Sequence, residues 1–112
     1  MKSANKELVG ASTGVLILGV LKRGASYGYD ILRQINEEAG GAFTWQEGTI
    51  YPLLHKLERE GLLRSRWQDS PEGRRRKYYL LTAAGREALQ VGSRQWEIFH
   101  QLIVRLAGAS HA

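Results

Sequence analysis

The sequence has no cysteine, two prolines, one methionine and no apolar run long enough to cross a bilayer. Without cysteine the chain can form no disulfide, thiolate zinc site or cysteine nucleophile, which is consistent with a cytoplasmic location. The longest apolar stretch, Gly10–Leu21, has twelve residues, whereas a membrane helix needs about 18. Lys22 and Arg23 follow it where a secretory signal would have small residues, so we interpret it as a buried helix. With 112 residues, one compact domain is expected.

The positive charge is concentrated in one short segment. The chain has 16 Lys and Arg against 11 Asp and Glu, a net charge of +5. Residues 56–77 carry eight basic and four acidic groups, and so hold four of the five net charges. Three of these groups, Arg74 to Arg76, follow a turn-forming stretch, and arginine binds phosphate bidentately. Although a charge run is often a solvated face, this one favours nucleic acid over a membrane or an acidic protein, because the segment is strand-like.

The first half of the chain predicts two helices and a short extended segment. The apolar residues of 6–21 cover several sides of a helix, which is typical of a buried one. Ser26 is the expected N-cap of a second helix over about 27–38, which ends at Gly40. Residues 43–45 have room for a strand stub.

A third helix is predicted from Thr49 to about Glu60, with Thr49 as N-cap and Pro52 in the first turn, where a missing N–H costs no hydrogen bond. Its apolar residues fall within one arc of the helical wheel: Ile50, Leu53, Leu54 and Leu57. The opposite arc is left for binding: Gly48, Pro52, His55 and Arg59.

A hairpin and a long helix complete the chain. Residues 62–68 and 76–82 are strand-like, and 69–73 is a turn. Thr82 is the expected N-cap of a helix over about 83–107, which has two apolar heptad series. These are Leu89, Trp96, Ile103 and Gly92, Phe99, Leu106. A helix of this length exceeds what a small domain needs, so we expect it to pair two copies of the chain.

The order of these elements predicts a mainly α protein with a small β-hairpin, a winged helix-turn-helix followed by a long C-terminal dimerisation helix. We place the DNA-binding domain at residues 1–82 and the dimerisation helix at 83–112. In this arrangement the third helix enters the major groove of DNA, and the hairpin lies on the flanking backbone or in the minor groove. Both elements coincide with the positive segment.

Three stretches carry more specific motifs. Residues 27–31 read YGYDI, residues 47–62 read EGTIYPLLHKLEREGL, and residues 73–85 read GRRRKYYLLTAAG. Together, over residues 8–107, they resemble the PadR-type bacterial transcriptional regulators. The second and third motifs are specific in combination, whereas the first alone is weak. The resemblance implies a dimeric repressor of the compact branch of the family, which lacks a longer C-terminal domain.

We expect double-stranded operator DNA to be bound by the start of the second helix, the outer side of the third helix and the hairpin. The expected residues are Ser26, Tyr27, Thr49, Tyr51, Pro52, His55, Lys56, Arg74, Arg75 and Lys77. The alternative role of Pro52 is to shape the start of its helix. The alternative for His55 is a solvated side chain that makes no contact with DNA. Arg76 alternates with its neighbours and is expected on the other face, and Tyr78 and Tyr79 are expected to pack in the sheet.

The expected homodimer interface consists of Leu8, Val15, Leu89, Trp96, Phe99, Ile103 and Leu106. The resemblance further implies that a planar aromatic effector binds between paired tryptophans. Trp96 matches that tryptophan, and Val15 is the second candidate ligand-binding residue. The alternative for Trp96 is a role in the dimer core alone.

No enzymatic chemistry is indicated. His55, His100 and His111 are far apart in the sequence, and no catalytic carboxylate pair, phosphate-binding glycine loop or metal-ligand spacing is present. We therefore expect no catalytic residue, cofactor or metal. The remaining alternative is a winged-helix protein-interaction module that does not bind DNA.

Overall fold

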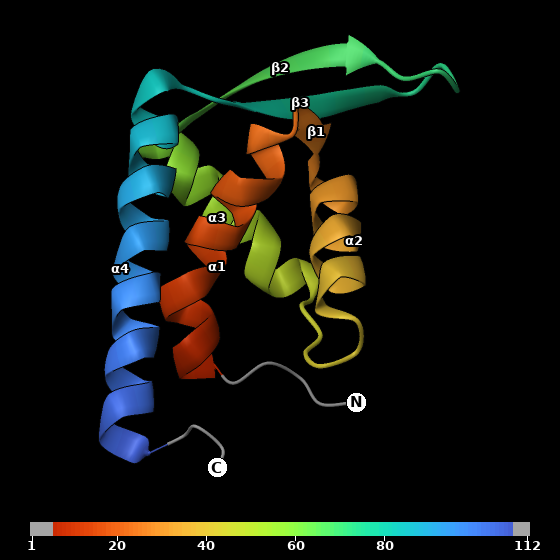
Figure 1. Ribbon diagram of the computed structural model, residues 1–112. Coiled ribbons are helices and arrows are strands. Elements are labelled where there is room, and N and C mark those ends of the chain that lie inside the picture. The colour runs from red at the N-terminus through yellow and green to blue at the C-terminus, as the bar shows by residue number, and fades with distance from the viewer. Residues whose placement is uncertain (1–5, 109–112) are drawn as a thin grey trace.

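The computed structural model describes residues 6–108, with side chains from residue 12 onward. Its helices are α1 (Lys6–Lys22), α2 (Gly28–Ala39), α3 (Glu47–Arg59) and α4 (Ala83–Ala107). Its strands are β1 (Ser26–Tyr27), β2 (Leu63–Asp69) and β3 (Arg75–Leu81). Figure 1 shows α4 along one side of the other helices and the β2–β3 hairpin across their end, with its tip extending beyond α2. The mainly α fold with a small sheet and a long last helix is as predicted.

The core lies between α1, α2 and α3. Ile17, Ile31, Ile50 and Leu54 are fully buried there, and each such side chain contributes roughly 1.5–3 kcal/mol by leaving water. Trp45, in the turn before α3, donates its indole N–H to the buried Thr13 hydroxyl at 2.9 Å.

A side-chain clamp fixes the turn between α2 and α3. The amide of Asn36 accepts from the backbone N–H of Trp45 at 2.8 Å and donates to the backbone oxygen of Trp45 at 3.1 Å. Both bonds are partly buried, and they attach the segment just before α3 to α2.

The third strand of the sheet is in a different place from the one predicted. The strand order is β1-β3-β2, with Ser26 opposite Tyr79 and Tyr27 opposite Tyr78. The predicted stub at residues 43–45 is reduced to a β-bridge at Thr44 outside this sheet. Ser26 is also not the N-cap of α2. Tyr27 occupies that position without a side-chain cap bond, and the Ser26 hydroxyl donates to the Asp30 carboxylate at 2.7 Å.

Helix α3 begins earlier than predicted, with Gln46 as N-cap. Thr49 is therefore a helical residue, and Pro52 lies at the sixth helical position rather than in the first turn. At that depth an N–H would normally donate to the carbonyl four residues back. Pro52 consequently leaves the Gly48 carbonyl without its helical partner.

The start of α4 is as predicted. The Thr82 hydroxyl accepts from the backbone N–H of Gly85 at 3.0 Å and donates to the backbone oxygen of Gly61 at 2.7 Å. One threonine thus caps α4 and joins it to the turn before β2.

Candidate nucleic-acid interface

Helix α3 divides into a buried and an exposed side. Ile50, Leu54 and Leu57 are buried, and Leu53 is half-buried against the core. On the other side, Gly48, Pro52, His55, Lys56 and Arg59 are all exposed. Within residues 12–108, no ion pair engages Lys56 or Arg59. The exposed side of α3 therefore presents two unneutralised cations and a histidine.

The hairpin cations fall into a paired and an unpaired group. Arg76 lies 3.4 Å from the Glu72 carboxylate and 4.2 Å above the Tyr27 ring. Lys77 lies 3.3 Å from the Glu58 carboxylate and 5.2 Å from the Tyr79 ring. Arg74 and Arg75 are exposed and form no ion pair in the described part of the chain, although the Arg74 charge helps to lower the pKa of Glu72. These two arginines remain available for an external anion.

The hairpin has two faces of different character. Residues opposite one another in an antiparallel pair share a face, and Trp67 faces Lys77 while Ser65 faces the buried Tyr79. This face therefore continues outward from the core. The opposite face carries Arg64 and Arg66, which are both exposed.

Glu58 fastens the base of the hairpin to the last turn of α3. Its carboxylate accepts from the Ser65 hydroxyl at 2.5 Å and lies 3.3 Å from the Lys77 ammonium. The Ser65 hydrogen bond, opposed by burial and assisted by Lys77, holds the pKa of Glu58 below its ordinary value. These contacts join Ser65 of β2 and Lys77 of β3 to the helix that carries Lys56 and Arg59.

The residues at the start of α2 are occupied by internal contacts. Ser26 is buried, with its hydroxyl bound to Asp30, and Tyr27 packs edge-on against Tyr78 at 5.5 Å. Burial raises the pKa of the Asp30 carboxyl, but hydrogen bonds from Ser26, Arg33 and Gln34 outweigh it and hold that pKa below its ordinary value.

Tyr51 connects α3 to the start of α2. A Cβ atom at Gly28 would overlap the Tyr51 ring, so glycine allows the two helices to approach here. Burial, together with the nearby Glu47 charge, raises the pKa of Tyr51. Its ring is half-buried and contributes to helix packing.

The predicted contact residues thus differ in accessibility. Five are exposed: Pro52, His55, Lys56, Arg74 and Arg75. Four are half-buried: Tyr27, Thr49, Tyr51 and Lys77. Ser26 is buried. Three further exposed residues of β2, Trp67, Arg64 and Arg66, are not among the predicted contact residues, although the alternation along residues 62–68 predicts exposed arginines on the face opposite Trp67.

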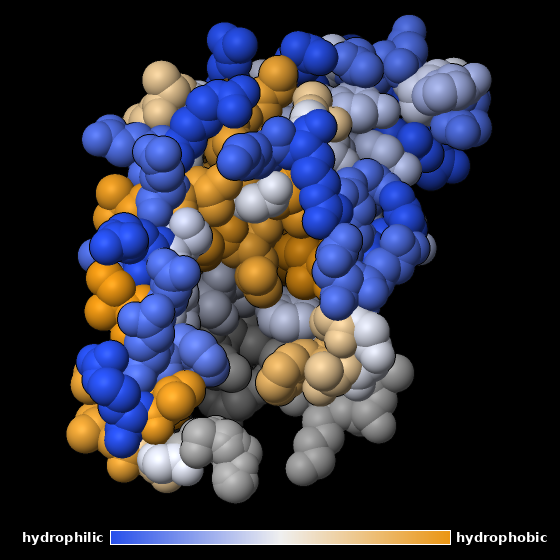
Figure 2. Space-filling view, viewed as in Figure 1, coloured by the Kyte–Doolittle hydropathy of each residue, from blue (hydrophilic) through white to orange (hydrophobic). Residues whose placement is uncertain are grey.

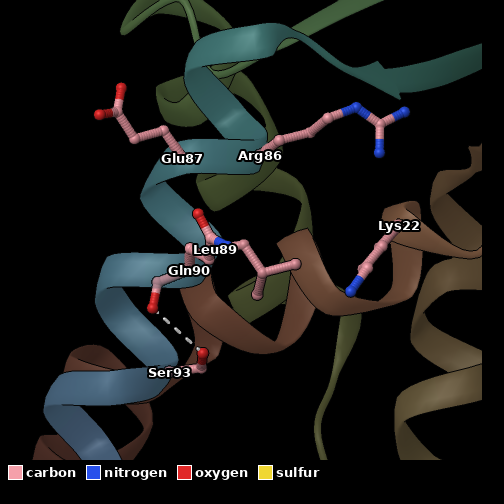
Figure 3. Close-up of a pocket in the computed structure, with 6 residues that line it drawn as sticks. All are labelled: Lys22, Arg86, Glu87, Leu89, Gln90 and Ser93. Carbon is pink, nitrogen blue, oxygen red and sulfur yellow. Dashed lines mark hydrogen bonds between the residues drawn. The ribbon is translucent and has the colours of Figure 1, made fainter.

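The predicted interface of α4 is partly used within the chain. A Cβ atom at Gly92 would lie 3.0 Å from Val15 of α1, and Leu89 packs against the core. Figure 3 shows Leu89 directed toward α1, in a hollow lined by Lys22, Arg86, Glu87, Gln90 and Ser93. Leu8 lies outside the residues whose side chains are described.

The second half of α4 has an apolar side without a partner in the described chain. Trp96 is half-buried and packs edge-on against Phe99 at 5.7 Å. Phe99, Ile103 and Leu106 are exposed, as are three residues that the heptad pattern missed, Val91, Ile98 and Leu102. From Val91 to Ile98 is seven residues and from Ile98 to Leu102 is four, a helical spacing that is visible in the sequence. Hydrophobic residues line the outer edge of α4 in Figure 2, in contrast to the hydrophilic hairpin at the top.

The described residues contain no cluster of three or more His, Cys, Asp or Glu side chains suited to a metal ion. None of their helices combines the length and the hydropathy that a membrane span requires.

Comparisons with known proteins agree on one family. The model of the transcriptional regulator PadR-like family matches residues 17–91. The negative transcriptional regulator PadR of Bacillus subtilis is 37% identical over 87 residues, which cover 78% of this chain and 46% of that protein.

Solved structures give the same result. A transcriptional regulator from Clostridium thermocellum matches with a TM-score of 0.81 and 26% identity, covering 89% of this chain and 97% of that one. Bacillus subtilis PadR in complex with operator DNA matches with a TM-score of 0.63 and 34% identity, covering 70% of this chain and 45% of that one. The chain therefore spans about half the length of that relative. Since the family model matches most of the sequence, the chain belongs to the PadR-like family of transcriptional regulators, and it is a regulator rather than an enzyme.

Proposed function

We propose that this regulator represses transcription in the cytoplasm by binding a specific duplex operator as a homodimer. Residues 1–82 form the DNA-binding domain in this proposal, and residues 83–112 hold the two copies together. The observation that carries it is a set of four exposed cations on the two expected DNA-contacting elements, Lys56 and Arg59 on α3 and Arg74 and Arg75 on the hairpin, none of which forms an ion pair in the described residues. The operator complex of Bacillus subtilis PadR supports DNA as the ligand, and the name of that relative supports repression.

In this mechanism each α3 enters the major groove, which is wide enough for one α-helix. His55, Lys56 and Arg59 face the groove, and the hairpin contacts the flanking backbone. The two α3 helices of the dimer read half-sites spaced by about one helical turn, roughly 34–36 Å. If the dimer neutralises about six phosphates, the logarithm of affinity falls with the logarithm of salt concentration with a slope of roughly −5.

The decisive experiment is selection of bound duplexes from a random pool by the purified protein. We expect enrichment of a sequence with two inverted half-sites. An intact dimer that enriches no duplex at low salt would contradict DNA binding and would favour a protein-interaction module.

The hairpin contribution is tested by Arg74→Ala on the selected duplex. Because Arg74 is exposed and forms no ion pair in the described chain, we expect each subunit to lose one phosphate contact. The salt slope then becomes shallower by roughly 0.9 per subunit. Arg105→Ala, at the far end of α4, removes the same charge and serves as the control, with an unchanged slope. Equal slopes for both variants would show that Arg74 does not contact the backbone.

We also propose that a planar aromatic effector binds at the dimer axis. Trp96 and Phe99, with Gln95, line a hollow on the apolar side of α4, and Val15 lies one helical turn away, against Gly92. A ligand there regulates DNA binding only if it favours one separation of the two α3 helices over another.

Trp96→Ala tests this effector site. We expect flat aromatic compounds to quench the tryptophan fluorescence of the native dimer and not that of the variant, which retains Trp45 and Trp67. Sedimentation must show that the variant is still dimeric. Quenching of equal size in both proteins would remove Trp96 from the ligand site.

A further inference from the structure

Trp67 is an aromatic residue in an unusual environment. It lies on β2, two residues beyond Ser65, and 59% of its surface is exposed. Trp45, by comparison, is 9% exposed in the core. Indole rings are normally well buried because their apolar area is large. The core does not account for Trp67, whose exposed indole is available for an external contact.

Arg75 lies over the Trp67 ring. The guanidinium carbon is 5.7 Å from the ring centre, within the range of a cation–π contact. In the sheet register Arg75 is opposite Asp69, and Trp67 is opposite Lys77, so Arg75 and Trp67 are diagonal neighbours on one face. Although Asp69 is directly across the ladder, no ion pair joins it to Arg75. The indole thus restricts the side-chain conformations of Arg75 without neutralising its charge.

The hairpin face that carries this pair is joined to α3 by an ion pair. Lys77 shares the face of Trp67 and Arg75 and is tied to Glu58 in the last turn of α3. Trp67 is directly opposite Lys77, and Arg75 lies two residues farther toward the hairpin tip, which extends past the helices (Figure 1). When α3 occupies a major groove, the hairpin of a winged helix-turn-helix lies on the flanking backbone or in the neighbouring minor groove.

We propose that Arg75, held on the Trp67 ring, enters the minor groove beside each half-site and makes the protein prefer A/T-rich flanking sequence. This inference rests on the proposed DNA binding and assigns Arg75 to the groove rather than to a phosphate. The narrow minor groove of A-tracts has an enhanced negative potential that attracts arginine. Apolar side chains are also common contacts within that groove. Trp67 acts as a positioning residue. Its ring positions the Arg75 guanidinium and packs against the deoxyriboses that line the groove.

The test uses the selected duplex in two forms that differ only outside the half-sites, one with A/T-rich and one with G/C-rich flanks. We expect the native protein to bind the A/T form roughly fivefold more tightly or better, in line with the discrimination of a specific arginine contact. Arg75→Ala and Trp67→Ala should each bring this ratio close to one. The double variant should change this ratio little more than either single variant does, because the two side chains act as one unit.

Two variants serve as controls. Arg74→Ala should weaken both complexes to the same extent, since a phosphate contact carries no sequence preference. Trp67→Phe should retain part of the ratio because it preserves an aromatic platform. Since Trp67 and Arg75 are exposed, circular dichroism melting should confirm that all variants remain folded.

The outcomes separate this inference from the proposed function. An unchanged flank ratio in Trp67→Ala, with DNA binding intact, overturns the role of Trp67 alone. Equal weakening of both duplexes by Arg75→Ala assigns Arg75 to a phosphate and overturns the groove contact. If the native protein binds no duplex, the proposed function and this inference fail together.

Discussion

Gly85→Ala lowers the free energy of unfolding by about 3 kcal/mol or more, as expected for severe overpacking at a site that cannot relax. Gly85 is buried in the first turn of α4, and a Cβ atom there would overlap the backbone oxygen of Leu62 and lie 3.0 Å from Leu81 Cδ2. The Leu62 oxygen accepts from the backbone N–H of Thr82 at 3.2 Å. Moving that oxygen would therefore disrupt the junction between β2 and α4.

Urea unfolding followed by circular dichroism measures this loss. Gly19→Ala is the matched control, because Gly19 also lies in a helix but a Cβ atom there would meet no atom within 4 Å. We expect the control to be stabilised by up to about 1 kcal/mol, through the higher helix propensity of alanine. A Gly85→Ala protein as stable as the native one would mean that α4 does not start against the Leu62 carbonyl.

The features that were predictable from sequence depend on neighbouring residues. The start of α4 was predicted because Thr82 caps it through a hydrogen bond three residues away. The end of α2 was predicted because Gly40 adopts the left-handed conformation, with φ of 60°, that terminates helices. In both cases a local sequence signal decides the structure.

Strand β1 and the start of α3, which differ from the sequence prediction, depend on contacts between residues that are distant in the sequence. Strand β1 has two residues and exists because it pairs with β3, about 50 residues later, so no local pattern announces it. The start of α3 is set by the Asn36 clamp on Trp45, and this tertiary contact overrides the capping preference of Thr49.

In the candidate site, too, some features follow from local sequence and others from contacts between distant residues. The positive segment and the exposed arc of α3 were visible in the sequence because charge and helical periodicity are local properties. The pairing of charges was not visible, since Lys77 meets Glu58 and Arg76 meets Tyr27 only after folding. Among the cations of residues 74–77, the structure therefore leaves Arg74 and Arg75 as the candidates for external contacts.

The double variant Ile103→Glu/Leu106→Glu should be monomeric and should lose about 100-fold or more in affinity for a duplex with two half-sites. Ile103 and Leu106 are 45% and 79% exposed, so the charges do not disturb the core of the subunit. They do disrupt pairing along α4, because a carboxylate buried in an apolar interface is strongly unfavourable. Without pairing, the second half-site is no longer bound at high effective concentration, and that avidity is worth about 100-fold or more.

Sedimentation analysis gives the mass of this variant, and titration of duplexes with one or two half-sites gives its affinity. Gln90→Glu/Gln101→Glu is the matched control, because it adds the same charge at exposed positions on the polar side of α4. The control should remain dimeric and lose little affinity, whereas the double variant should bind both duplexes with the same weak affinity. A double variant with the mass of a dimer would show that the copies pair through another surface. A monomer that keeps the native affinity would show that pairing is not how this protein reads DNA.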